Sequence, residues 1–214
     1  SKSPAVSTPR AMLDVAAAPS PAKDADGRRR RSQDSRARIV QAMLELVHAG
    51  ETSPPAELVA DRAKVGLRTV FRHFNDMDSL YREMSAVIGA ELQDVIAQPF
   101  KAVDWRGRVL ELVQRRASAY ERIAPFRRAA DVHRLRSQVL EADHARFATL
   151  AREILRRELP AEAARDKARF EALDMLLSFE AWARLRRDQG LSAKRTVEAL
   201  ELAVAALIAG FDAP

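Results

Sequence analysis

The chain has 214 residues, of which 47% are hydrophobic and 31% charged, so it is long enough to bury an apolar core beneath a well-solvated surface. It contains no cysteine, which excludes disulfides, thiolate catalysis and sulfur-ligated metal sites. The net charge is +6, and residues 1–75 alone carry 13 Lys or Arg against 8 Asp or Glu, so a polyanion would be attracted to the front of the chain.

Residues 1–31 are predicted to form a flexible basic arm. They are rich in Ser, Pro, Ala and charged side chains and hold few large apolar groups, so burial cannot offset the entropy lost on ordering. The arm ends in four consecutive arginines: Arg28, Arg29, Arg30 and Arg31. We interpret them as contacts to a polyanion; the alternative is a basic tail without a partner.

Residues 32–78 are predicted to form a small domain of short helices. Its first helix carries apolar residues at spacings of three and four: Ile39, Met43, Leu46 and Val47. Gly50 suits the left-handed position that follows a helix, and Ser53 before two prolines predicts the capped start of the next helix. Asp76 offers a capping oxygen for a longer helix.

Residues 79–214 are predicted to form a larger helical domain. Asp104 and Ser192 are expected to cap helices, Pro125 is expected to break one, and a single long helix is expected over 166–189. No segment shows the two-residue alternation of a half-buried strand. The predicted fold class is therefore all-α, with about nine helices.

The segment 53–74 has the arrangement of a helix-turn-helix. A short helix, a tight bend at 63–66 and a second short helix at 67–73 follow one another. Ala63 is small where two helices must approach, and Val70 is apolar where the pair packs on the first helix. The second helix of such a motif lies in the major groove of DNA.

The outward face of that second helix supplies the candidate DNA contacts. Arg68 and Arg72 are four residues apart and share one face, and arginine pairs bidentately with guanine or phosphate. Thr69 suits a phosphate or a thymine methyl group, and His73 suits a phosphate. Together with the arm, the candidate DNA-binding residues are Arg28, Arg29, Arg30, Arg31, Leu67, Arg68, Thr69, Arg72 and His73.

The run from Val59 to Phe74, followed by Leu80 and Tyr81, resembles the TetR family of bacterial helix-turn-helix transcriptional regulators over roughly residues 36–81. That family shows an alanine, a turn glycine and a valine, then a threonine, an aromatic pair and His-Phe. Spacing and residue type agree along the whole stretch without a gap.

Three positions depart from the family pattern. The turn glycine is Lys64, the serine that caps the recognition helix is Gly66, and the lysine that begins the next helix is Met77. A positive φ at Lys64 would cost on the order of 1 kcal/mol. We expect the arginines at 28–31 to replace the ionic contact missing at Met77, along the minor groove or the DNA backbone.

The resemblance implies a sequence-specific regulator, usually a repressor, that a small-molecule effector releases from a palindromic site on double-stranded DNA. It also implies that residues 79–214 bind the effector and form a homodimer through the last two helices, about 166–189 and 192–209. An apolar stripe allows this pairing: Leu200, Val204, Leu207 and Phe211, with Ala203 and Ala206 beside it. The alternative is that the stripe packs inside one subunit.

Seven large side chains are candidates for the walls of an effector pocket, the alternative for each being a place in the core: Trp105, Tyr120, Phe126, Phe147, Met175, Phe179 and Trp182. The four histidines show no zinc-binding spacing, and neither a glycine-rich phosphate loop nor a nucleophile turn occurs. We therefore expect no metal, no cofactor and no enzymatic activity.

Two other functions stay open at this point. One is an all-α enzyme or small-molecule carrier whose first helices only imitate the motif, and the other is a DNA-coating protein without an effector. No apolar run reaches the roughly 18 residues of a membrane span. Residues 11–18 include Asp14 and follow no basic cluster, so no signal peptide is expected and the cytoplasm is the expected location.

Overall fold

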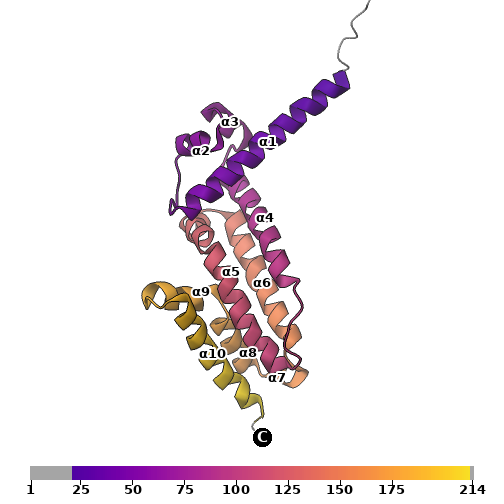
Figure 1. The fold of residues 1–214 in the computed structure, drawn as a ribbon, viewed down its shortest axis with the longest axis vertical. Coiled ribbons are helices and arrows are strands. Elements are labelled where there is room, and N and C mark those ends of the chain that lie inside the picture. The colour runs from indigo at the N-terminus through magenta and orange to yellow at the C-terminus, as the bar shows by residue number, and fades with distance from the viewer. Residues whose placement is uncertain (1–20, 213–214) are drawn as a thin grey trace, which may run out of the picture.

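The all-α prediction is confirmed for residues 21–212, the part of the chain that the computed structural model describes, because that part contains helices and no strand. Figure 1 shows the order of the elements along the chain. The helices are α1 (Pro21–His48), α2 (Ala56–Ala63), α3 (Leu67–His73), α4 (Met77–Ile96), α5 (Trp105–Arg134), α6 (Gln138–Glu158), α7 (Ala161–Arg165), α8 (Lys167–Leu176), α9 (Phe179–Ala183), a π-helical turn (Arg184–Asp188), α10 (Ala193–Ala209) and a 3₁₀ turn (Gly210–Asp212).

The first three helices occupy one end of an elongated molecule. In Figure 1, α1, α2 and α3 lie at the upper end, and α4, α5 and α6 run lengthwise below them, with α10 packed along α5. Helix α4 belongs to both groups, since it contacts α1 as well as α5 and α6. Among residues 21–212, no helix combines the length and the apolarity that a membrane span requires.

The core at the upper end is made by the apolar stripe predicted on the first helix. Ile39 and Met43 are fully buried in α1, and Val59, Val70 and Phe74 from α2 and α3 belong to the same core. Burying an apolar side chain of this size contributes about 1.5–3 kcal/mol. Packing on α1 therefore holds two helices that are too short to be stable alone.

A second core lies between α5, α8 and α10. Val109, Leu173 and Val204 are fully buried there, and Leu200 is buried beside them. The stripe that was expected to pair two subunits thus packs on α5 within one subunit for its first half. Leu200 and Val204 lie four residues apart on one face of α10, and the apolar faces of α5 and α8 in the same chain cover that face.

Three of the predicted helix caps are confirmed. Asp76, Asp104 and Ser192 each accept a hydrogen bond from the backbone amide three residues later, at 2.7, 2.9 and 3.2 Å. The prediction for Ser53 is wrong: α2 begins after Pro55 and has no side-chain cap. The two prolines place the Ser53 hydroxyl too far from the first helical turn to serve it.

Two predicted helix boundaries are wrong. Pro125 lies inside α5, which continues because Ile123 and Phe126 on either side of it are buried in the core and hold the helix despite the missing amide hydrogen. The single helix expected over 166–189 is divided into α8, α9 and the π-helical turn. The hydroxyl of Ser178 accepts a hydrogen bond from the amide of residue 181 at 3.1 Å, which starts α9 as a new helix.

The predicted flexible arm differs from the structure over residues 21–31. Helix α1 begins at Pro21, so the four arginines at 28–31 lie on a helix, while residues 1–20 lie outside the described part. Alanine and arginine are strong helix formers, and extending a helix that packing has already nucleated needs no new nucleus. The composition that indicated disorder therefore supports a helix once residues 32–48 are folded.

Candidate nucleic-acid interface and ligand cavity

The turn between α2 and α3 has the geometry of a helix-turn-helix. Lys64 follows α2 in the left-handed conformation, with φ 55° and ψ 45°. The amide of Val65 donates to the carbonyl of Ala60 at 3.1 Å, which closes the turn. Helix α3 then begins directly after Gly66, as predicted. Lysine thus occupies a position that favours glycine, at an energetic cost of about 1–2 kcal/mol.

Helix α3 presents a basic and apolar face to the outside. Arg68 and Arg72 are exposed, and neither has an ion-pair partner among residues 21–212. Leu67 is 37% exposed and Thr69 is half-buried, so the structure brings four of the predicted contacts to one short helix. Sequence reasoning did not include Phe71 among the candidates, although this residue is 55% exposed on the same helix. An exposed aromatic ring suits apolar contact with a thymine methyl group.

His73 is placed differently from the other predicted contacts. Its side chain is half-buried, and its Nε2 atom is buried without a hydrogen-bond partner in the described structure. Burial lowers the pKa of His73, and the nearby charges of Arg72 and Arg36 lower it further. The imidazole is therefore neutral at pH 7 and contributes to packing under α3 rather than to its outer surface.

Arg36 joins three helices of this end, and sequence reasoning missed it. Its Nη1 donates to the carbonyl of His73 at 2.7 Å, its Nε pairs with the carboxylate of Glu83, and its guanidinium lies 4.4 Å from the ring centre of Phe74. In the sequence, His73 lies 37 residues after Arg36 and Glu83 lies 47 residues after it. A single side chain of α1 thereby fixes the end of α3 against α4.

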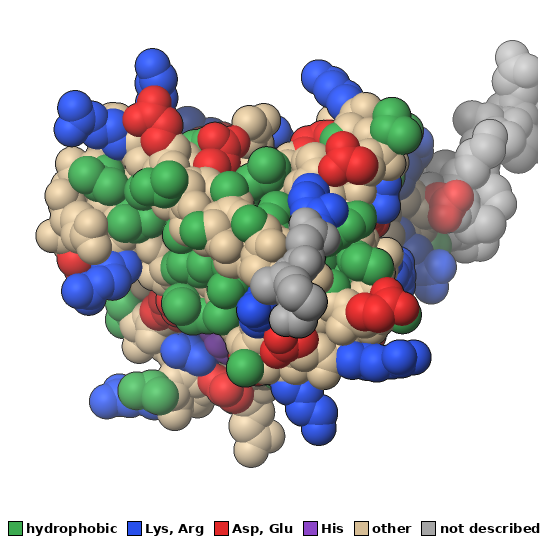
Figure 2. All heavy atoms as spheres, turned by 90° about the horizontal axis from the view of Figure 1, so that it is seen from below, with side chains coloured by type: hydrophobic (Ala, Val, Ile, Leu, Met, Phe, Trp, Pro, Cys, Tyr) green, Lys and Arg blue, Asp and Glu red, His purple; other side chains and the backbone are tan. Residues whose placement is uncertain are grey.

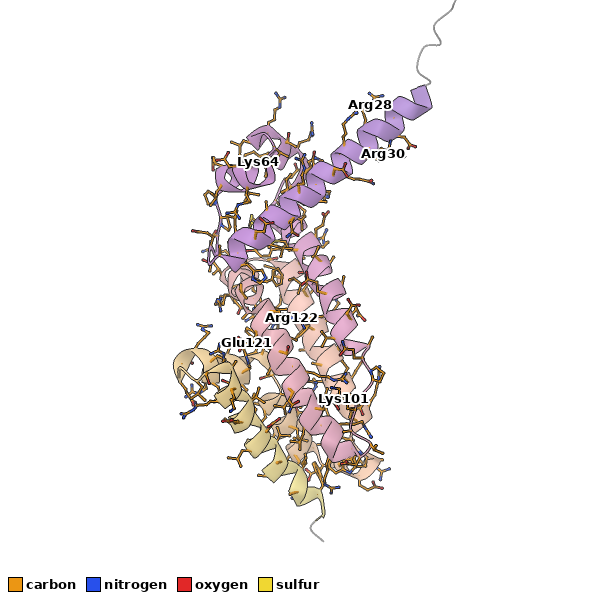
Figure 3. All side chains as sticks on the ribbon, viewed as in Figure 1. Arg28, Arg30, Lys64, Lys101, Glu121 and Arg122 are labelled. Carbon is orange, nitrogen blue, oxygen red and sulfur yellow. The ribbon has the colours of Figure 1, made fainter. Side chains whose placement is uncertain are left out.

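The four arginines at 28–31 lie on the part of α1 that projects from the rest of the molecule (Figures 1 and 3). All four side chains are exposed. Figure 3 shows Lys64 on the turn beside the other part of α1, so the projecting helix leads away from the helix-turn-helix. The structure therefore does not bring these arginines to the surface of α3.

A cavity of about 820 Å³ lies between α4, α5 and α6. Its walls are largely apolar, with Leu92 from α4, Phe126 from α5 and Phe147 from α6. A second cavity of about 200 Å³ shares Leu92 and Phe147 and adds Tyr120, whose hydroxyl donates to the carbonyl of Leu177 at 2.8 Å. The volume and the apolar lining of the larger cavity are typical of a site for a small organic molecule.

The seven predicted pocket residues divide into two groups. Phe126, Phe147, Tyr120 and Phe179 line cavities, the last of these in a third cavity of about 70 Å³. The other three lie elsewhere: Trp105 packs edge-on against Phe211 at 6.0 Å, Trp182 is buried against Tyr120 and Phe179, and Met175 is 57% exposed.

A buried arginine that sequence reasoning missed lies in the cavity wall. Arg127 is 9% exposed, pairs with Glu180 at 3.2 Å and lies 3.0 Å from Nδ1 of His144. Burial lowers the pKa of His144, and the charge of Arg127 lowers it further, so the ring is neutral and its Nδ1 accepts from the guanidinium. The charge in this wall is thus compensated within the protein.

No family model matches the chain, and no curated protein matches it. The structure is similar to the crystal structure of a transcriptional regulator from Rhodococcus sp. Rha1, with a TM-score of 0.61 and 17% sequence identity over 84% of this chain and 99% of that chain. The two proteins therefore have the same fold over most of their length.

Proposed function

We propose that the protein is a DNA-binding transcriptional regulator of the TetR type. In this proposal residues 32–78 bind a palindromic DNA site in the cytoplasm, and residues 79–214 bind a small-molecule effector and form the dimer. The protein acts as a repressor that the effector releases from DNA. The fold that it has in common with a transcriptional regulator from Rhodococcus supports this proposal.

The outer face of α3 is the observation that carries the proposal. Arg68 and Arg72 lie exposed beside Phe71 on a helix only seven residues long, at one end of the molecule. Two guanidinium groups and a ring left in water have no role in the packing of this domain, whereas a DNA groove offers phosphates, guanine edges and thymine methyl groups to all three.

The dimer in this proposal uses the outer face of α10 and α8, because Leu200 and Val204 of the predicted stripe are buried within the subunit. Leu202 is 75% exposed and Met175 is 57% exposed, and the small residues Ala199 and Ala206 lie on the Leu202 side of α10. Figure 2 shows the molecule from below, at the end opposite to α2 and α3. Hydrophobic side chains are exposed there on the side where Figure 1 places α10. Small residues allow two helices to approach closely.

Replacing Leu202 with Glu tests the dimer. The change places a charge in the proposed interface, so sedimentation should show a monomer in place of a dimer. The control is Leu135→Glu, at a residue that is 92% exposed and lies between α5 and α6, outside α8 and α10. A dimer that survives Leu202→Glu would contradict the interface.

The cavity between α4, α5 and α6 supports the effector. Helix α4 lines it through Ile88 and Leu92 and also contacts α1, so a ligand that displaces α4 acts on both ends of the molecule. The response is limited by the difference between the ligand's affinities for the DNA-binding and released states. The same cavity favours the second candidate function, a small-molecule carrier or enzyme that does not bind DNA.

Selection of bound sequences from a random DNA pool separates the two candidates. We expect the wild-type protein to recover a palindromic site, and Arg68→Ala and Arg72→Ala each to weaken binding to that site by about 10- to 100-fold, since one bidentate contact is worth about 1–3 kcal/mol. Arg187→Ala, an exposed arginine outside α3, is the control and should leave binding unchanged. No recovered site, or full binding by both α3 variants, would favour the second candidate.

A further inference from the structure

We infer that the ligand bound between α4, α5 and α6 is an organic carboxylate with an apolar tail, and that Arg116 on α5 binds its acid group. The site is the cavity of about 200 Å³, whose wall includes Arg116. The inference rests on the proposed function in one respect, because it takes this ligand to be the effector and names its chemical class.

Arg116 differs from the other charged side chains in the wall of this cavity. Three of the four have a partner of opposite charge: Arg115 pairs with Glu111 at 2.6 Å, Glu158 with Arg108 at 2.7 Å and Arg157 with Glu153 at 3.9 Å. The fourth, Arg116, is half-buried and has no carboxylate partner among residues 21–212. The described part of the protein thus leaves its charge in this wall without a counter-ion.

The acidic residues nearest to Arg116 in the adjoining cavity belong to other arginines. Asp174 and Glu180 line the cavity of about 70 Å³ together with Arg116. Asp174 pairs with Arg152 at 2.7 Å, and Glu180 pairs with Arg127 at 3.2 Å. Both acids are therefore neutralised by a closer guanidinium than that of Arg116.

The guanidinium of Arg116 is held in place and keeps donors for a ligand. Its Nη2 donates to the carbonyl of Ala151 on α6 at 2.6 Å, and its Nη1 donates to the carbonyl of Leu177, which follows α8, at 3.3 Å. Both acceptors are neutral, and three of the five N–H donors of the guanidinium have no partner within residues 21–212. An arginine fixed in this way is preorganised for the bidentate pairing that its planar group makes with a carboxylate.

The remainder of the wall favours an apolar tail. Leu92 and Ile96 from α4, Leu112 from α5 and Ile154 from α6 line the same cavity. An ion pair among apolar side chains is stronger than the same pair at the surface, because the local dielectric constant is lower. A carboxylate would compensate the charge of Arg116, whereas an alcohol would leave it uncompensated and an ammonium group would be repelled.

A series of matched ligands tests the chemical class. The probes are hexanoate, octanoate, decanoate and dodecanoate, and isothermal titration calorimetry on the full chain compares each with the alcohol and the amine of the same length at neutral pH. We expect the carboxylate that binds best to bind about 10- to 100-fold more tightly than its alcohol, because hydrogen bonds between charged groups are the stronger ones. No binding by any carboxylate, an alcohol of equal affinity or an amine of higher affinity would overturn the inference.

A charge-matched pair of variants tests the residue. Arg116→Gln removes the charge but keeps an amide that can donate to a backbone carbonyl, and Arg157→Gln removes a charge from the same wall at an exposed residue. We expect Arg116→Gln to lose the preference for the carboxylate over the alcohol, Arg157→Gln to keep it, and Arg116→Lys, which retains the charge without the planar fork, to have an intermediate preference. Circular dichroism checks that the variants are folded. An undiminished preference in folded Arg116→Gln, or an equal loss in Arg157→Gln, would overturn the role of Arg116.

The outcome for DNA separates this inference from the proposed function. If a carboxylate binds through Arg116 but sequence selection recovers no palindromic site, the proposed regulator fails while the ligand class stands. If a palindromic site is recovered and no carboxylate binds more tightly than its alcohol, the inference fails while the proposed function stands.

Discussion

Replacing Lys64 with glycine is expected to stabilise the protein. Lys64 has φ 55°, the one positive φ at a residue other than glycine within 21–212, and its side chain is exposed. The left-handed conformation costs an L-residue about 1–2 kcal/mol, and glycine removes that cost. Glycine also makes the unfolded chain more flexible, which costs about 0.4–1 kcal/mol. The net gain in the free energy of unfolding is therefore about 0.5–1 kcal/mol.

Thermal unfolding followed by circular dichroism measures this gain. For a chain of this length, the expected rise in Tm is about 1–4 °C. Lys64→Ala is the matched control, because alanine removes the charge and the long side chain but keeps a Cβ atom in the left-handed conformation. We expect no rise in Tm for Lys64→Ala. A Tm that is unchanged or lower in Lys64→Gly, or equally raised in both variants, would refute the argument from backbone strain.

Three further predictions concern helices α5, α6 and α9. Tyr120→Phe removes the buried hydrogen bond to the carbonyl of Leu177 and should lower the free energy of unfolding by about 1–3 kcal/mol, measured by urea denaturation. Ser178→Ala removes the cap of α9 and should cost about 1 kcal/mol by the same measurement. Because burial and Arg127 lower the pKa of His144 in the folded state, stability should be complete above the usual pKa of about 6.5 and fall as the pH drops below it. His144→Gln should make stability less dependent on pH in this range.

For each of these three variants, a different measured result would contradict the prediction. Full stability of Tyr120→Phe would mean that water replaces the lost hydrogen bond. An unchanged urea midpoint in Ser178→Ala would mean that α9 is held by packing alone. A wild-type protein whose stability does not fall as the pH drops below about 6.5, or an unchanged pH profile in His144→Gln, would mean that the protonation of His144 does not affect folding.

The parts of the structure that depend on local pattern could be predicted from the sequence. Helix α3 begins after Gly66 and ends at His73 as expected, because the turn, the apolar spacing and the outward arginines all lie within a few residues of one another. The caps at Asp76 and Asp104 have the same local origin.

Features that depend on distant partners could not be predicted. Arg36 acts through His73 and Glu83, and no spacing within α1 marks it among the other arginines of that helix. Pro125 has the local signature of a helix break, but packing on both sides outweighs the lost hydrogen bond. Whether an aromatic residue lines a cavity depends on which helices meet, which separates Phe147 in the cavity wall from Trp105, whose ring packs against Phe211 instead.

The hydrogen bond and ion pair of Arg36 have a consequence for how helix α3 opens. A helix of seven residues is far shorter than the roughly 12–15 residues that an isolated helix needs, so α3 has almost no stability of its own. Since one guanidinium holds its last carbonyl and the side of α4 together, the backbone amides of α3 should exchange with solvent only when α1 and α4 also open. Helix α3 and the bundle of α4, α5 and α6 would then form one cooperative unit, and their backbone amides would have a common protection factor rather than separate ones.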